Sequence, residues 1–174
     1  MWTFCPLEPN LLFLTKMLRS AAMSENFIKL RRALEDYIQY FETLSPRSIG
    51  RIDDLAEPSI RFKDPFHDVQ GTDAFASVFK NMFNRMCRPR FRVQDVAWGR
   101  TNNDGEARTA YLRWIFTFEL AGEKRRIEGV SEILLSQRGR VMAHIDHWDS
   151  SEQFYEHIPI LGAFLRLVKQ KLKA

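Results

Sequence analysis

This sequence has few of the features of disulfide-rich, nucleic-acid-binding or membrane-spanning proteins. Its only cysteines, Cys5 and Cys87, form no motif, so we expect reduced thiols and a cytoplasmic protein. Its Lys and Arg residues are scattered among Asp and Glu except in the tail, where residues 166–173 concentrate cations, and there is no zinc-finger spacing or basic stripe with interleaved aromatic residues. No apolar run has the length of a transmembrane helix. We therefore expect no nucleic-acid partner and no membrane span.

The composition is that of a globular domain with a core of large rings. The 174 residues are 45% apolar and include 14 Phe and 4 Trp. Residues 1–23 differ from the rest, because a regular helical pattern begins only at Ser24. We interpret 1–23 as an N-terminal extension that is disordered or packs loosely, and 24–174 as a single domain.

Helical periodicity predicts three helices in the first half of this domain. Ser24 can cap the first helix. Ser45-Pro46 begins the second, with proline at the first helical position, and Pro58 ends it. The third is expected from about residue 72 to residue 87. Two apolar stripes define the first and third helices: Phe27, Leu30, Leu34, Tyr37, Ile38 and Phe41, then Phe75, Val78, Phe79, Met82, Phe83 and Met86.

Strands are predicted both before and after the third helix. The expected ranges are 60–64, 91–98, 108–120, 126–136 and 141–149. In the longest, alternation puts Leu112, Trp114 and Phe116 on one face and Arg113 on the other. A short helix from Ser150 and a final helix follow. The pattern predicts an α+β fold, with three N-terminal helices packed on a curved, mostly antiparallel sheet and a C-terminal helix.

Asp64 is the first candidate site residue. An alternating run ends at Asp64-Pro65, between Phe62 and Phe66, because proline cannot donate to a sheet ladder. A carboxylate between two phenylalanines at the end of a strand is suited to act as a general acid or base. The alternative is that Asp64 caps the turn that the Asp-Pro pair begins.

The last strand holds a second candidate group. Period-two geometry puts His144, Asp146 and Trp148 on one sheet face and His147 on the other. The first three either line a cleft, as proton carrier, carboxylate and stacking wall, or form a polar pair beneath an aromatic ring. Because His144 and His147 project oppositely and no second ligand has a standard spacing, we expect no metal site.

Several motifs together resemble the nuclear transport factor 2-like superfamily, and most of all its SnoaL-like branch. They are D-P-F-H-D-V-Q-G at 64–71, G-V-S at 129–131, and G-R-V at 139–141 leading into 144–149. The resemblance covers residues 27–162. It implies a cone, in which a strongly curved sheet wraps three helices around a pocket, and a frequent homodimer through the outer sheet face. Enzymes, binding proteins and transport factors share this cone, so the fold alone does not give the function.

The ketosteroid isomerases in this superfamily supply one set of site residues. Their proton-shuttling Asp, in an Asp-Pro pair at the end of the first strand, matches Asp64. Their oxyanion-stabilising Tyr matches Tyr40 without gaps, and Tyr37 is a rival for the same role. Ser131 stands where they place a second, protonated Asp, so this chain departs from their pattern there.

Two further enzyme types place an Asp in the last strand, where it matches Asp146. Limonene-epoxide-type hydrolases also need an Arg and a second Asp two residues apart. Arg113 matches their Arg, but Ile115 stands in place of that Asp. SnoaL-type polyketide cyclases need only one such Asp within an apolar cavity. Asp146 with His144 fits this minimal requirement best.

We therefore predict a pocket for a small apolar or polyketide-like molecule. Its candidate acid and base groups are Asp146 and Asp64, with Tyr40 and His144 as hydrogen-bond partners. The expected chemistry is proton transfer beside a carbonyl, or an aldol-type closure, without metal or cofactor. The alternative is a non-catalytic ligand-binding or protein-interaction module. The expected substrate-binding residues are Trp114, Phe116, Trp148, Ser131, Phe62 and Phe66.

Overall fold

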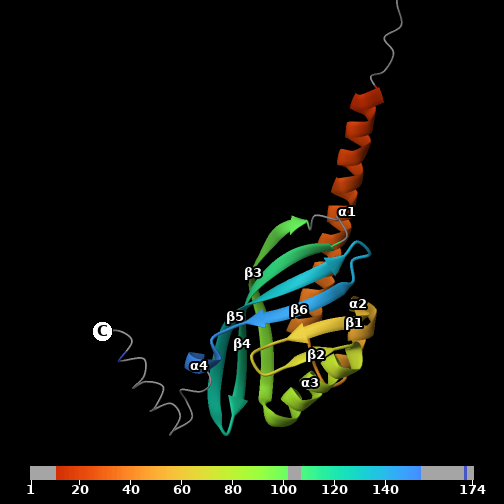
Figure 1. Cartoon of the computed structure of the whole chain (residues 1–174). Helices are drawn as coiled ribbons and strands as arrows, with labels where there is room; N and C mark the ends of the chain where they lie inside the picture. The colour runs from red at the N-terminus through yellow and green to blue at the C-terminus, as the bar shows by residue number, and fades with distance from the viewer. Residues whose placement is uncertain (1–10, 102–106, 154–170, 172–174) are drawn as a thin grey trace, which may run out of the picture.

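A six-stranded sheet wraps around three helices, which all lie on its concave side (Figure 1). The computed structural model describes residues 11–101, 107–153 and 171. The helical elements are α1 (Leu11–Glu42), the 3-10 turn η1 (Ile49–Arg51), α2 (Ile52–Leu55), α3 (Thr72–Arg85) and α4 (Ser150–Gln153). The strands are β1 (Ala56–Lys63), β2 (Asp68–Gln70), β3 (Cys87–Thr101), β4 (Ala107–Leu120), β5 (Glu123–Ser136) and β6 (Val141–His147). The predicted α+β cone is confirmed.

The sheet is mixed, and all of its strand pairs except one are antiparallel. Its strand order is β2-β1-β6-β5-β4-β3, and only the β1–β6 pair is parallel. The long strands β3, β4 and β5 form a meander, while β1 and β2 come from the helical half of the chain. Consequently β6 lies between β1 and β5, which are far apart in the sequence.

The predicted alternation in β4 is confirmed. Leu112, Trp114 and Phe116 are buried on the concave face, whereas Tyr111 and Arg113 are exposed on the convex face. The helices complete the core with rings of their own, including Tyr37, Tyr40, Phe41, Phe75 and Phe79. Burying a phenylalanine side chain from water contributes roughly 1.5–3 kcal/mol, so each ring in this interior is a substantial part of the stability.

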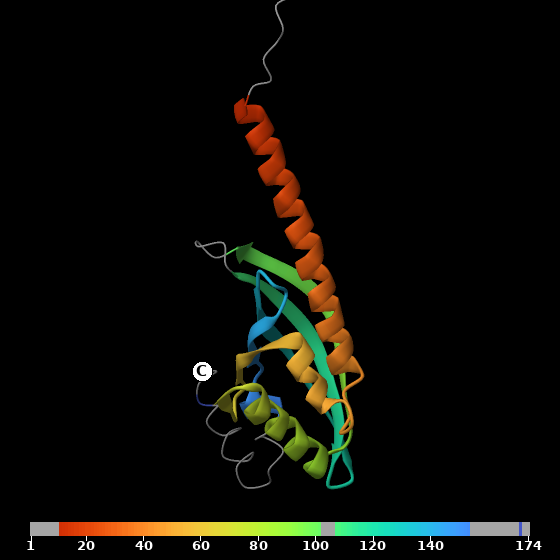
Figure 2. The ribbon, with the colours of Figure 1, turned by 90° about the vertical axis from the view of Figure 1, so that its right-hand side faces the viewer.

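The first helix is much longer than its predicted start at Ser24. It begins at Leu11 and continues without a break to Glu42. The prediction was wrong because residues 11–42 contain neither Gly nor Pro, and a run of good helix formers passes straight through Ser24. Figure 2 shows that the first half of α1 projects beyond the sheet. The division of the chain at residue 23 stays a prediction.

The region between α1 and β1 also departs from the expected pattern. Instead of a helix that ends at Pro58, there are η1 and one turn of α2, and β1 already begins at Ala56. Pro58 is tolerated inside β1 because the β1–β6 register shifts between Ala56 and Arg61. Arg140 binds the backbone of this region, because its guanidinium donates hydrogen bonds to the carbonyl oxygens of Asp53, Asp54 and Ala56.

Two details at the ends of the sheet also differ from the sequence pattern. Residues 68–70 were expected as loop and instead form the edge strand β2. The last strand ends at His147, so Trp148 follows the strand instead of belonging to it. The final helix predicted near the C-terminus lies outside the described residues.

Candidate functional site

The candidate site is built on β6, where His144 and Asp146 face the concave side. They are two residues apart, so period-two geometry directs both side chains the same way. The His144 Nε2 atom lies 2.9 Å from Asp146 Oδ1. The His144 side chain is 5% exposed and that of Asp146 13%, so the pair is almost closed to solvent.

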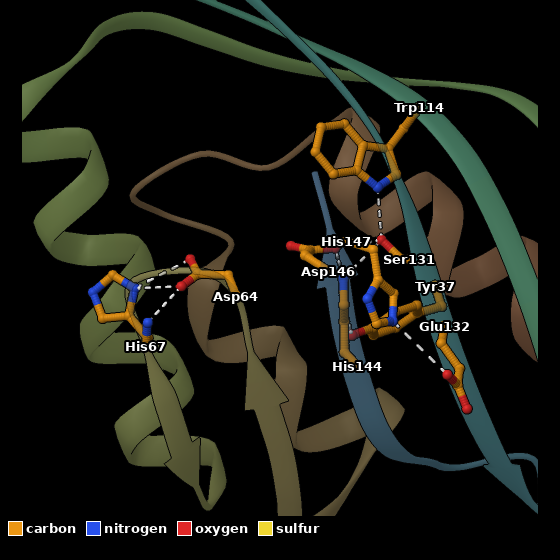
Figure 3. Close-up of polar contacts among 9 residues, drawn as sticks. All are labelled: Tyr37, Asp64, His67, Trp114, Ser131, Glu132, His144, Asp146 and His147. Atoms are coloured by element: carbon orange, nitrogen blue, oxygen red, sulfur yellow. Dashed lines mark hydrogen bonds and ion pairs between the residues drawn. The ribbon is translucent and has the colours of Figure 1, made fainter. Parts of the chain in front are cut away.

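The neighbouring strand adds Ser131 and Trp114 to the pair. Ser131 lies directly opposite Asp146 in the β5–β6 register, and its hydroxyl donates to Asp146 Oδ1 at 2.5 Å. Trp114 comes from β4, and its indole N–H donates to Ser131 Oγ at 2.7 Å. Side chains of two adjacent strands, β5 and β6, therefore meet at one carboxyl oxygen, and Trp114 of β4 holds the serine that donates to it (Figure 3).

Helix α1 contributes Tyr37, whose hydroxyl lies 2.9 Å from His144 Nδ1. Because an ionised carboxylate can only accept, the Nε2 atom of His144 carries the proton that faces Asp146. In the neutral ring Nδ1 then accepts from the Tyr37 hydroxyl. Burial raises the pKa of Tyr37 well above its ordinary value, and nearby Tyr40 and Asp146 raise it further. Tyr37 therefore remains a hydrogen-bond donor.

Tyr40, the residue favoured by the gap-free match, points elsewhere. Its hydroxyl donates to the backbone oxygen of Ile49 at 2.9 Å, which ties α1 to η1. Burial raises the pKa of Tyr40 as well. Of the two tyrosines left open by the sequence, Tyr37 is the one that reaches the His144–Asp146 pair.

The bonds to Asp146 are unequal on its two oxygens. Oδ1 accepts from both His144 and Ser131, whereas Oδ2 has no hydrogen bond to any described residue. A carboxylate held by one oxygen keeps the other free to accept a proton. The arrangement is suited to proton transfer by a fixed carboxylate.

Asp64 follows directly after the end of β1, the strand that pairs with β6. The last pairs of the parallel β1–β6 register are Phe62 with His144 and Lys63 with Ile145, so Asp64 begins the turn just beyond the paired residues. Asp64 Oδ1 accepts from the backbone N–H groups of Phe66 and His67, at 2.7 and 2.6 Å. The His67 Nδ1 atom lies 3.0 Å from Oδ1 and 3.1 Å from Oδ2.

Both oxygens of Asp64 are thus engaged within its own turn, as Figure 3 shows. This is the turn-capping arrangement that the sequence left open as one of two interpretations. The involvement of His67 was not foreseen, although the Asp-Pro-x-His spacing, in which the histidine follows three residues after the aspartate, is a signal that could have revealed it.

The candidate substrate-binding residues fall into two groups. Phe62, Trp114, Phe116 and Ser131 are buried in the cone. The Phe62 ring lies 5.3 Å from His144, and Phe116 stacks on Phe91 at 4.2 Å. Phe66 and Trp148 instead meet each other at the strand ends, with ring centroids 5.4 Å apart. These two rings are therefore the only candidates placed at the margin of the interior.

Gly129 is a site residue that the sequence analysis named only as part of a motif. A Cβ atom there would lie 2.6 Å from Trp114 Cζ2 and 2.9 Å from the backbone oxygen of His147. The absence of a side chain therefore makes room for the Trp114 ring, which reaches Ser131. No local pattern reveals this, because the two residues meet only in the β4–β5 pairing.

Two surface hollows lie away from this network. One, of about 740 Å³, is lined by residues of the α1–η1 connection, β3 and β4. The other, of about 390 Å³, is lined by Arg126, Glu128, Asp149, Glu152 and Gln153. Neither is lined by Asp146 or Asp64, so a ligand cavity at the predicted site remains a prediction.

The chain belongs to the SnoaL-like family. The family model for the SnoaL-like domain matches residues 37–144, which is more than half of the chain. That segment includes Tyr37, Asp64, Ser131 and His144, and Asp146 follows two residues beyond its end. Among proteins of curated function, no sequence matches this chain.

Solved structures with the same fold are distant in sequence. A nuclear transport factor 2-like superfamily protein from Salmonella enterica has a TM-score of 0.58 at 16% identity, over 72% of this chain and 92% of that one. A candidate scytalone dehydratase from Novosphingobium aromaticivorans has a TM-score of 0.57 at 8% identity, over 74% and 87%. A candidate polyketide cyclase from Xanthomonas campestris has a TM-score of 0.53 at 14% identity, over 73% and 95%. At these identities the likeness shows the fold alone.

Two statements about the described part of the chain bear on partners. None of its helices is long and apolar enough to cross a membrane. Within the same residues, no cluster of three or more His, Cys, Asp or Glu side chains could hold a metal ion.

Proposed function

We propose that this protein binds a small apolar or polyketide-like molecule and that Asp146 transfers a proton on it. The observation that carries the proposal is the unequal bonding of Asp146. Oδ1 is held by His144 and Ser131, while Oδ2 has no partner among the described residues. A general base acts efficiently when it is held in a fixed position relative to the substrate. Here the hydrogen bonds from His144 and Ser131 orient the Asp146 carboxylate.

The proposed step is removal of a proton from a carbon beside a carbonyl, with Oδ2 as the base. When Asp146 takes up the proton, its negative charge is lost, and the His144 and Ser131 donors to Oδ1 keep the side chain in place. Tyr37 holds the His144 ring from its other nitrogen at 2.9 Å. In the cyclase-like form the carbanion attacks a second carbonyl carbon of the same molecule, and Asp146 returns the proton to the alkoxide oxygen that forms. In the isomerase-like form Asp146 returns the proton to another carbon of the molecule.

The hydrogen bonds favour the cyclase-like form over the isomerase-like form. A ketosteroid-type isomerisation needs donors that stabilise an oxyanion. Here the hydroxyls of Ser131, Tyr37 and Tyr40 are directed at Asp146, His144 and Ile49. The SnoaL-type cyclases that the chain resembles are matched here by a single positioned Asp and by buried rings around it, without a dedicated pair of oxyanion donors.

Deuterium incorporation tests the proposal even when the substrate has not been identified. Ligands retained by the purified protein are identified by native mass spectrometry and then incubated with fresh protein in D₂O. We expect the wild type to introduce deuterium and Asp146→Asn to bind the ligand without doing so. The Asn amide can present its oxygen to His144 and Ser131, so the fold should persist, as circular dichroism will check.

Asp64→Asn is the matched control, because Asp64 follows the strand that pairs with β6 but is engaged in its own turn. It should retain exchange. Equal exchange by wild type and Asp146→Asn, or loss of exchange only in Asp64→Asn, would refute the role of Asp146. In the latter case the isomerase-like role of Asp64 would replace it.

The second candidate function is a non-catalytic binding module. The observation that favours it is the dense packing of rings inside the cone, where Phe62, Phe75, Phe79 and Phe91 surround Phe41 and His144. This alternative predicts ligand retention without deuterium exchange in either wild type or variant.

We also propose that the chain forms a homodimer through its convex sheet face. Tyr111 and Val130 are 40% and 36% exposed there, and charged neighbours such as Arg113 and Glu132 surround them. A second copy of the same face would cover these apolar side chains. Sedimentation at tens of micromolar should show a dimer, and a strict monomer would refute it.

A further inference from the structure

The hollow of about 740 Å³ lies at the sheet edge formed by β3. Its volume falls within the range of small-molecule sites, which is roughly 300–1,000 Å³. It is separate from the Asp146 network, and its β4 residues Ile115 and Thr117 lie on the convex face, next to the proposed dimer surface. We call it the β3 groove. Its lining residues are Glu42, Thr43, Leu44, Pro89, Arg90, Phe91, Arg92, Ile115 and Thr117.

Two arginines give the β3 groove its chemistry. Arg90 and Arg92 are two residues apart on β3, so their side chains leave the same face about 7 Å apart. They lie opposite Thr117 and Ile115 in the β3–β4 register. Both arginines are exposed, and neither has an ion-pair partner among the residues that the structure describes. Phe91, between them, points inward and stacks on Phe116.

The groove's acidic residue is already engaged. Glu42, at the end of α1, accepts the backbone N–H of Val93 at 2.8 Å. Pro89 has no N–H to offer. Two positions along this edge therefore cannot donate to an added strand, which argues against an extended peptide as the occupant. A small molecule fits better.

We propose that the β3 groove binds an organic monocarboxylate with an apolar body. Two arginines and one glutamate give the lining one net positive charge, which a single carboxylate neutralises. A carboxylate is also the group that a guanidinium binds through two parallel hydrogen bonds. The apolar body would lie along Leu44 and Ile115, and Thr117, which pairs with Arg90 in the register and lines the groove, would donate its hydroxyl to the same carboxylate.

The test compares octanoate with 1-octanol, which have the same chain length and differ in charge. Titration of the full-length protein is followed by ¹H–¹⁵N NMR. We expect octanoate to shift the amides of residues 43–44 and 90–93 and to bind more tightly than octanol. Losing one charge-assisted contact, in Arg90→Gln or Arg92→Gln, should weaken octanoate binding about tenfold. Octanol binding should not change.

Matched variants separate this site from nonspecific attraction. Arg88→Gln removes a charge from the same strand outside the groove and should leave octanoate affinity unchanged. Glu42→Gln keeps an oxygen acceptor for Val93 but raises the net charge of the groove, so it should tighten octanoate binding severalfold. Equal binding of octanoate and octanol, an equal loss in Arg88→Gln, or shifts confined to Ser131, His144 and Asp146 would each overturn the proposal.

Discussion

Two His–Asp pairs lie on neighbouring strand ends of this protein, and they are built in opposite ways. His144 and Asp146 are on a strand, with side chains 5% and 13% exposed. His67 and Asp64 are in a turn, with side chains 41% and 15% exposed. The N–O distances are nearly the same, at 2.9 and 3.0 Å. Distance alone therefore does not distinguish them.

The difference lies in where the remaining partners come from. The His144–Asp146 pair is held by Tyr37, Trp114 and Ser131, which are far away in the sequence. The Asp64–His67 pair is held by backbone N–H groups two and three residues away. The first pair requires the assembled cone, while the second requires only a local turn. Within the described part of the chain, Oδ2 of Asp146 has no hydrogen-bond partner, whereas both oxygens of Asp64 are engaged.

The largest effect that separates the two pairs is expected from alanine substitution of each histidine. His144→Ala removes a buried ring and leaves Tyr37 without its partner, which should lower the free energy of unfolding by about 3 kcal/mol. His67→Ala removes an exposed partner and should cost about 0–1 kcal/mol. Urea unfolding measures both. Equal losses would show that the two pairs are structurally equivalent.

The next effect concerns the room that Gly129 leaves for Trp114. Gly129→Ala places a Cβ atom against the indole and should destabilise the protein by about 1–3 kcal/mol. Trp114→Phe in the same chain should recover part of that loss. Gly50→Ala is the control, since a Cβ there would meet nothing within 4 Å. Thermal unfolding is measured for the wild type, Gly129→Ala, the double variant and Gly50→Ala. Equal destabilisation by Gly129→Ala and Gly50→Ala would show that the Trp114 ring does not need the space at Gly129.

Alkaline pH should reveal the link between Tyr37 and the buried pair. Burial raises the pKa of Tyr37, so the folded state keeps a proton that the unfolded chain loses above pH about 10. The stability from this tyrosine is therefore complete below that pH and is lost as the pH rises further. Tyr37→Phe should flatten the decline and cost about 1 kcal/mol at neutral pH.

Tyr40→Phe provides the comparison for Tyr37→Phe, because the pKa of Tyr40 is raised by burial too. Both variants should flatten the alkaline decline. Only Tyr37→Phe should change the ¹⁵N chemical shifts of the His144 ring, since only Tyr37 bonds to it. A change of these shifts in Tyr40→Phe alone would contradict the assignment of Tyr37.

The smallest effect is expected at Asp64. Asp64→Asn keeps an oxygen for the N–H groups of Phe66 and His67, so stability should change by less than about 0.5 kcal/mol. Asp64→Ala removes that acceptor and should cost about 1 kcal/mol. Urea unfolding with a hydrogen-exchange measurement at residues 66 and 67 checks both. A larger loss in Asp64→Asn would show that the charge of Asp64, and not its turn, is what matters.

Much of the fold followed from local patterns. Alternation in residues 108–120 predicted which face of β4 is buried, because a strand directs successive side chains to opposite sides. The same rule put His144 and Asp146 together. The Asp-Pro pair predicted a strand end and offered turn capping as one role for Asp64. Each of these predictions depends on residues within a few positions of one another.

Other features depended on contacts between distant segments. Tyr37 and Tyr40 are three residues apart on one helix and are both fully or almost fully buried, so no sequence pattern separates them. Only the placement of His144 beside one and Ile49 beside the other decides their roles. The space that Gly129 leaves for Trp114, and the bond from Ser131 to Oδ1 of Asp146, likewise exist only once the strands are paired. Periodicity determined which side chains face inward, and the tertiary structure decided which of them meet, because meeting depends on strand register and helix position.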